Sequence, residues 1–257
     1  MKKNIKLLVI ACVLSACGSE GVNKFADPQL IKIAGLQDRR LSDSLYVYAE
    51  HENPVYRKEA ALAFASVQDT LAADRLGKLL LSDTDPEVKK AAAIALGQIR
   101  CKASAEILQR ALQAEKDPTV LREILEACGK TFHAGDVSKF TVTSTDSLTH
   151  EGLAWAYYRL SLRNQADSTL TLKSAEYLKP TYGLQTRLGA ANFFTRGAQQ
   201  AALVEAQLIE AARHDTSPWV RASVTGALRK IQSAASLAAL KEILKTDGDY
   251  RVRVSAV

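Results

Sequence analysis

Cys17 is the residue whose type and surroundings point most clearly to chemistry. A deprotonated cysteine sulfur is a nucleophile, and this one follows a Leu-Ser-Ala sequence whose small residues leave the backbone open to a peptidase. Three lysines and then an apolar run at residues 7–14 precede it. Because that run is shorter than the roughly 20 residues of a membrane-spanning helix, it predicts a cleaved signal peptide over residues 1–16.

The Leu-Ser-Ala-Cys sequence resembles the lipobox of bacterial lipoproteins. The resemblance implies that the Cys17 thiol carries a diacylglyceryl group and that residues 17–27 form the lipidated cysteine and its tether. Each buried acyl CH₂ contributes ~0.8 kcal/mol, so several chains hold a protein at a membrane. Gly18 is not the aspartate that retains some lipoproteins at the inner membrane, which favours the outer membrane, facing the periplasm. The alternative is an ordinary secretory signal with an incidental cysteine.

No other group of side chains has the spacing of a catalytic or metal site. The sequence contains no P-loop, no G-x-S-x-G, no dinucleotide-binding glycines and no H-E-x-x-H. The histidines form no i, i+4 pair and lie beside no cysteine or carboxylate cluster at metal-ligand spacing; they are His51, His133, His150 and His214. We therefore expect no catalytic residue, metal or cofactor in this chain.

The composition favours helices and a mixed-charge surface. The chain is 47% hydrophobic but only 6% aromatic, and alanine and leucine, which supply most apolar residues, lose little freedom in a helix. Removal of the three lysines of the signal peptide lowers the formal charge from +6 to +3, spread along the chain. Nucleic-acid binding would need a concentrated basic stripe, and none is evident. We expect no nucleic-acid partner.

A repeated segment that begins with proline recurs at a constant interval. Pro54, Pro86 and Pro118 lie 32 residues apart. Each is the second residue of a similar stretch: NPVYRKEAALAFA, DPEVKKAAAIALG and DPTVLREILEACG. The pattern returns as SPWVR from Ser217 and, without the proline, as DYRVR from Asp249. Aspartate or asparagine before proline is typical of a helix cap, and proline suits the first helical position. Valine then points inward, and the alanines let neighbouring helices approach.

Two further positions in the segment have expected roles. Gly97 and Gly129 are predicted to end their helices in the left-handed conformation. A basic residue follows the valine, and stacked repeats would align these residues in a ladder that bonds cap aspartates or carbonyls of the adjacent repeat, or else binds an acidic partner. The basic positions are Arg57, Lys89, Arg122, Arg187, Arg221 and Arg253.

The segments resemble the second helix of HEAT repeats, whose usual form is D-P-x-V-R-x-x-A-A-x-A-L-G. The resemblance covers residues 41–257 and implies an all-α solenoid of about 6–7 stacked helical hairpins, which bury their apolar faces against one another. We assign HEAT-like repeats to residues 28–135 and 198–257, the last one truncated, and two divergent repeats to residues 136–197. A small insertion between two solenoid halves is the alternative for that middle region.

Cys101 and Cys128 remain once Cys12 and Cys17 are set aside. An oxidising compartment would allow them to form a disulfide. Cys128 aligns with Leu96 and is expected in the core, whereas Cys101 falls beyond a helix end, and a disulfide needs Cα atoms within about 7 Å. The sequence leaves this pairing open.

Aromatic residues concentrate in and just after the divergent middle, where they would either fill the core or bind a partner. Tryptophan and tyrosine are enriched at interaction hot spots. The candidate partner-binding residues on the concave surface are Trp155, Tyr157, Tyr158, Tyr182 and Trp219, with Phe193 and Phe194 nearby in the sequence.

These features predict a membrane-anchored scaffold that binds a protein or peptide in the bacterial envelope. The alternative is a fragment, because the chain resembles the first part of lipoproteins that combine HEAT repeats with a cyclophilin-type peptidyl-prolyl isomerase domain. That family's F-H-R-like and Q-G-G-D-like motifs are absent from this chain. A third interpretation, a phycobilin-lyase-like or iron-binding relative, lacks the carboxylates and histidines that such a site needs.

Overall fold

The computed structural model describes residues 26–133, 140, 142, 145–197 and 200–257. The predicted signal peptide, Cys17 and most of the tether lie outside this part. The described residues form fourteen α-helices and no strand, so the predicted all-α solenoid is confirmed.

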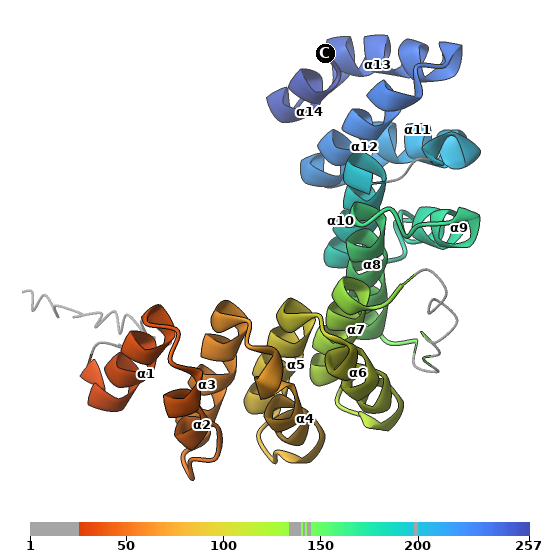
Figure 1. The fold of residues 1–257 in the computed structure, drawn as a ribbon. Helices are drawn as coiled ribbons and strands as arrows, with labels where there is room; N and C mark the ends of the chain where they lie inside the picture. Colours follow the sequence, from red (N-terminus) through yellow and green to blue (C-terminus); the bar gives the residue numbers. More distant parts are fainter. Residues whose placement is uncertain (1–25, 134–139, 141, 143–144, 198–199) are drawn as a thin grey trace, which may run out of the picture.

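The helices form two layers (Figure 1). The inner layer contains α1 (Pro28–Asp38), α3 (Pro54–Val67), α5 (Pro86–Ile99), α7 (Pro118–Thr131), α8 (Ser147–Leu162), α10 (Leu184–Asn192), α12 (Pro218–Ile231) and α14 (Tyr250–Ser255). The outer layer contains α2 (Ser42–Ala49), α4 (Ala73–Ser82), α6 (Lys102–Ala114), α9 (Ser168–Glu176), α11 (Glu205–His214) and α13 (Ala234–Thr246).

The inner helices begin where the sequence places their caps. The side chains of Asn53, Asp85 and Asp117 each accept a hydrogen bond from a backbone N–H of the first turn, and the following proline occupies the first helical position. Asp249 caps α14 in the same way, whereas Ser217 makes no such side-chain bond. The cap prediction is therefore confirmed at the acidic and asparagine positions.

The glycine prediction is wrong. Gly97 and Gly129 lie inside α5 and α7, and no described glycine has a positive φ. A Cβ at Gly97 would lie 2.9 Å from the Cα of Ala127 in the next inner helix. Glycine suits these two positions because a neighbouring helix passes too close for a side chain. The left-handed residues that end α3, α5 and α12 are Gln68, Arg100 and Gln232.

The regular alternation of layers is interrupted between α7 and α8. These two inner helices pack directly on each other, and no helix among the described residues lies between them along the chain. Phe140 and Val142 pack against the core in that region. The solenoid bends here: α1–α6 form one arm and α8–α14 the other, with α7 where they meet (Figure 1). We call this junction the elbow.

The two cysteines lie as the repeat alignment predicts. Cys128 is fully buried in the core, and Cys101 is half-buried at the start of α6, where its sulfur accepts a hydrogen bond from the N–H of Ser104. Both are free thiols. Burial raises the pKa of the Cys128 thiol well above its ordinary value, which keeps it uncharged and unreactive.

Candidate functional site

The basic positions form a ladder along the edge where inner helices begin. Arg57 on α3 donates two hydrogen bonds to the carboxylate of Asp83, at 2.7 and 2.8 Å, and two more to carbonyls of the turn before its own helix. Equivalent contacts to a carboxylate join Lys89 to Glu115, Arg187 to Asp215 and Arg221 to Asp247. Each of these cations thus connects its own helix to the turn before the next inner helix.

The partner is a carboxylate of the turn, two positions before the residue that caps the next inner helix. That carboxylate also accepts the backbone N–H of the cap residue, as Asp83 does from Asp85 at 2.9 Å. In the first hairpin the position holds His51, whose Nδ1 accepts the N–H of Asn53 at 3.0 Å. The ladder position of the preceding inner helix, α1, holds Ile31 and therefore supplies no cation to this residue.

Arg122 is not part of the ladder, contrary to the prediction. It lies four residues after Pro118, one position later than the ladder residues, so Leu121 takes the ladder position. Arg122 instead pairs with Glu123 and, at 3.1 Å, with Glu151 on α8. Arg253 bonds the carbonyl of Asp247 in its own turn.

Acid is expected to weaken the ladder. Burial would raise the pKa of Asp83, but hydrogen bonds from Arg57 and from the Asp85 N–H hold it below its ordinary value. The Arg221 hydrogen bond likewise lowers the pKa of Asp247. A carboxylate with a lowered folded-state pKa stabilises the fold above its unfolded pKa, and this contribution is lost as pH falls through the folded value.

We therefore expect the melting temperature to hold steady from neutral pH to about 5 and to drop below about pH 4, where free carboxyls protonate. Thermal melts followed by circular dichroism across pH 2–8 would measure it. The Asp83→Asn variant should have a lower melting temperature than the wild type at neutral pH, and its melting temperature should fall less on acidification. An unchanged acid dependence in that variant would contradict the assigned role.

At the elbow, two aromatic rings lie among paired charges. Trp155 and Tyr158 on α8 are half-buried, with ring centroids 5.7 Å apart and an edge-to-face geometry. The guanidinium of Arg159 lies 5.3 Å from the Tyr158 ring centroid and donates to Glu126 of α7 at 2.7 and 3.0 Å. Lys130 also contacts Glu126, at 3.2 Å. We call the surface formed by Arg122, Glu123, Glu126, Trp155, Tyr158 and Arg159 the elbow surface.

The carboxylates of the elbow surface differ in their electrostatics. Burial raises the pKa of Glu123, and the neighbouring charges only partly offset it. Burial acts on Glu126 too, but Lys130 and Arg159 hold its pKa below the ordinary value. The surface therefore combines paired charges with flat aromatic rings, which is suited to contact with a polar peptide or protein face.

The five candidate aromatic residues do not come together in one patch. Only Trp155 and Tyr158 share a surface. Tyr157 is 3% exposed, and its ring stacks on Tyr177, which in turn meets the edge of Tyr182. These rings pack the space between α8 and the α9–α10 connection, and Phe193 and Phe194 are buried as well.

Trp219 lies apart, near the start of α12. It is 57% exposed, and the guanidinium of Arg251 on α14 lies 4.1 Å from its ring centroid. A partner role for Trp219 stays a prediction, as it does for Trp155 and Tyr158, whereas the burial of Tyr157 makes its side chain part of the core.

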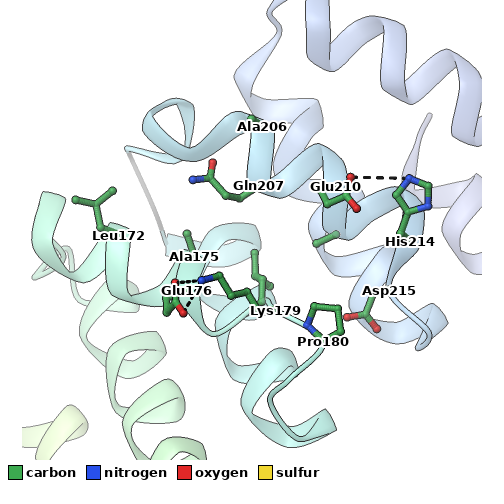
Figure 2. Close-up of a pocket in the computed structure, with 12 residues that line it drawn as sticks. Leu172, Ala175, Glu176, Lys179, Pro180, Ala206, Gln207, Glu210, His214 and Asp215 are labelled. Atoms are coloured by element: carbon green, nitrogen blue, oxygen red, sulfur yellow. Dashed lines mark hydrogen bonds and ion pairs between the residues drawn. The ribbon is translucent and has the colours of Figure 1, made fainter.

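A cavity lies in the outer layer. It has a volume of about 620 Å³ and opens between α9 and α11. Leu172, Ala175 and Ala206 contribute apolar surface (Figure 2). Glu176 pairs with Lys179 on one side of this groove, and Glu210 contacts His214 on the other.

Two negative findings concern the described residues alone. No group of three histidine, cysteine, aspartate or glutamate side chains in them is placed to hold a metal ion. None of their helices combines the length and apolar character needed to cross a membrane.

Comparison with known proteins identifies the repeats. The family model described as HEAT repeats matches residues 73–142 and 186–257, more than half of the chain. The chain belongs to the HEAT-repeat family. No curated protein matches it. The solved structure of human deoxyhypusine hydroxylase in complex with glycerol is 21% identical, with a TM-score of 0.38 and coverage of 90% of this chain and 88% of that chain.

The HEAT-repeat pattern alone does not reveal the elbow glutamates or the outer groove. Glu123 and Glu126 occupy positions that hold Ala91 and Ile94 in the preceding repeat. The change from apolar to acidic residues on one face of α7 is the signal that could have located this surface. The groove has no comparable signal, because it depends on how far apart two outer helices lie.

Proposed function

We propose that this HEAT-repeat chain is a non-enzymatic scaffold, held at the bacterial envelope by a lipid on Cys17, which binds a protein or peptide partner at the elbow surface. The observation that carries the proposal is the pair of accessible rings, Trp155 and Tyr158, set among partly buried, paired charges where the two arms meet. Aromatic and arginine side chains in such settings supply most of the affinity at interfaces.

The lipid is proposed on sequence alone: a basic start, a short apolar run and a Leu-Ser-Ala-Cys sequence. A lipid-anchored solenoid would present its inner surface within reach of envelope proteins. HEAT repeats support this use, because stacked repeats offer extended concave surfaces.

The test places a photo-crosslinking amino acid at position 155 in cells and at position 241 as a control, since Lys241 is exposed on the outer helix α13. We expect discrete crosslinked species from position 155 that disappear when Tyr158 and Arg159 are also replaced by alanine. The same cells carrying Cys17→Ser should lose acyl labelling and membrane association. Equal crosslinking from both positions would contradict the elbow assignment, and unlabelled wild-type protein would contradict the anchor.

The alternative from the sequence, a scaffold that supports a cyclophilin-type isomerase domain, predicts a different result. In-frame coding sequence beyond codon 257 would contain the F-H-R-like and Q-G-G-D-like motifs, and its product would accelerate prolyl isomerisation.

A further inference from the structure

Cations gather along the edge of the solenoid where the inner helices end. Arg163, Arg196 and Arg229 are evenly spaced in the sequence. Arg163 directly follows α8, Arg196 lies in the π-helical turn Phe193–Gly197 after α10, and Arg229 lies in the last turn of α12. Arg100 and Lys230 lie at the ends of α5 and α12. Within the part of the chain that the structure describes, no carboxylate pairs with any of these five side chains. We call this row, together with Lys102, the basic edge.

The contacts between helices make the basic edge continuous. Arg163 donates to the carbonyl of Gly129 at 3.2 Å, and it lies close enough to Arg100 for the two charges to repel. Burial, and then Arg100, lower the pKa of Arg163. Farther along, Gly197 packs against Ser161, and Lys230 donates to the carbonyl of Thr195. The helix ends that carry these cations therefore follow one another along the edge from α5 to α12.

Helix ends explain part of this arrangement, because a cation is favourable beside the carbonyls of a helix C-terminus. They do not explain the lack of carboxylate partners, since on the opposite edge the ladder cations are paired. Among the described residues, the acids near the basic edge are already engaged: Glu106 lies 3.8 Å from Lys102, Asp167 caps α9, and Glu205 accepts bonds from Ser233 and Ser236. The edge keeps a surplus of positive charge.

A cavity of about 340 Å³ opens on the same edge, between the ends of α5 and α7 and the start of α6. Arg100, Lys102 and His133 are among the residues that line it, together with one carboxylate, Glu106. Its size and the two cations Arg100 and Lys102 suit a small anionic group such as a phosphate ester.

We propose that the basic edge docks on anionic lipid headgroups, so that the solenoid lies along the membrane surface. This inference rests on the proposed lipid anchor, which would hold the whole protein at the bilayer surface. Lipids diffuse within the membrane and can meet cations at irregular spacing. A nucleic acid has fixed phosphate spacing, and the basic edge offers no aromatic ring on which bases would stack.

The test compares two triple variants of the full chain, prepared without lipidation. One reverses exposed cations of the basic edge: Lys102→Glu, Arg196→Glu and Arg229→Glu. Its control makes the same charge change on the outer helices α4, α9 and α13, with Lys78→Glu, Lys173→Glu and Lys241→Glu. Flotation at low salt measures binding to vesicles of phosphatidylcholine that contain about 30% phosphatidylglycerol, which gives them an anionic surface.

Both variants keep the wild-type sequence ahead of α1, so any difference between them comes from the solenoid. We expect the edge variant to bind anionic vesicles about ten-fold or more weakly than the wild type, because each surface cation contributes measurably to such binding. The control should stay within about two- to three-fold, and circular dichroism melts should show that both variants fold.

Equal losses in both variants, or equal binding of the wild type to neutral and anionic vesicles, would overturn the proposal. Tighter binding of the wild type to a DNA duplex than to vesicles would overturn it in favour of a nucleic acid. Lipidation of Cys17 is measured independently by acyl labelling in cells, so failure of the anchor and failure of the edge are distinguishable.

Discussion

Replacing Arg187 by leucine is expected to destabilise the fold by about 3–5 kcal/mol, because the substitution leaves a buried carboxylate without its cation. The side chains of Arg187 and Asp215 are only 10% and 2% exposed. The guanidinium donates to both oxygens of Asp215, at 2.8 and 3.3 Å, and to the carbonyl of Tyr182 at 2.6 Å. Leucine satisfies none of these acceptors.

Urea denaturation followed by circular dichroism would measure the loss. Arg213→Ala is the matched control, because Arg213 and Glu242 pair between the adjacent outer helices with side chains 36% and 51% exposed. An exposed pair contributes at most about 1 kcal/mol. Arg187→Lys should fall between the two, since lysine keeps the charge but not the planar geometry. If Arg187→Leu costs no more than Arg213→Ala, the buried pair does not hold these repeats together.

Gly129→Ala is expected to have the next largest effect, a loss of about 1–3 kcal/mol from overpacking. A Cβ at this position would lie 2.5 Å from both the Cα and the carbonyl oxygen of Ala156 on α8. Backbone atoms cannot rotate away, so α7 and α8 must separate at the elbow. The usual gain of about 1 kcal/mol for glycine to alanine in a helix is therefore outweighed.

The control has the opposite sign. Gly226 lies inside α12, and the nearest atom to an added Cβ is the Thr195 methyl group at 3.4 Å. Gly226→Ala should stabilise the protein by up to about 1 kcal/mol. Chemical denaturation of both variants separates the two effects, and a Gly129→Ala protein as stable as the wild type would show that the elbow tolerates a wider helix spacing.

The parts of the fold that depend on local chemistry could be predicted from the sequence. A carboxylate or asparagine before proline favours the start of a helix through local contacts alone. The starts of α3, α5 and α7 therefore follow from Asn53, Asp85 and Asp117. The parts that depend on distance between helices could not. A glycine such as Gly129 serves either a left-handed backbone or a close approach, and one sequence does not distinguish them.

The candidate site was predicted only in part for the same reason. The sequence indicates that aromatic residues are concentrated in the middle of the chain, but the face on which each one lies depends on the rotation of α8. Tyr157 and Tyr158 are neighbours in the sequence, yet one is buried against Tyr177 and the other lies on the elbow surface. The basic edge could not be predicted from the sequence, because its arginines lie about a whole repeat apart and each has an unremarkable local sequence.

The ladder gives the repeats a direction. Arg57 reaches forward to Asp83, and Arg221 reaches forward to Asp247, so every described rung joins one hairpin to its successor. A repeat that is duplicated or deleted as a whole carries one cation and one carboxylate with it. The cation–carboxylate pairs between the remaining repeats then stay intact. An insertion of any other length separates a donor from its acceptor. The array can therefore change length by whole units during evolution, whereas changes within a unit are confined to its loops.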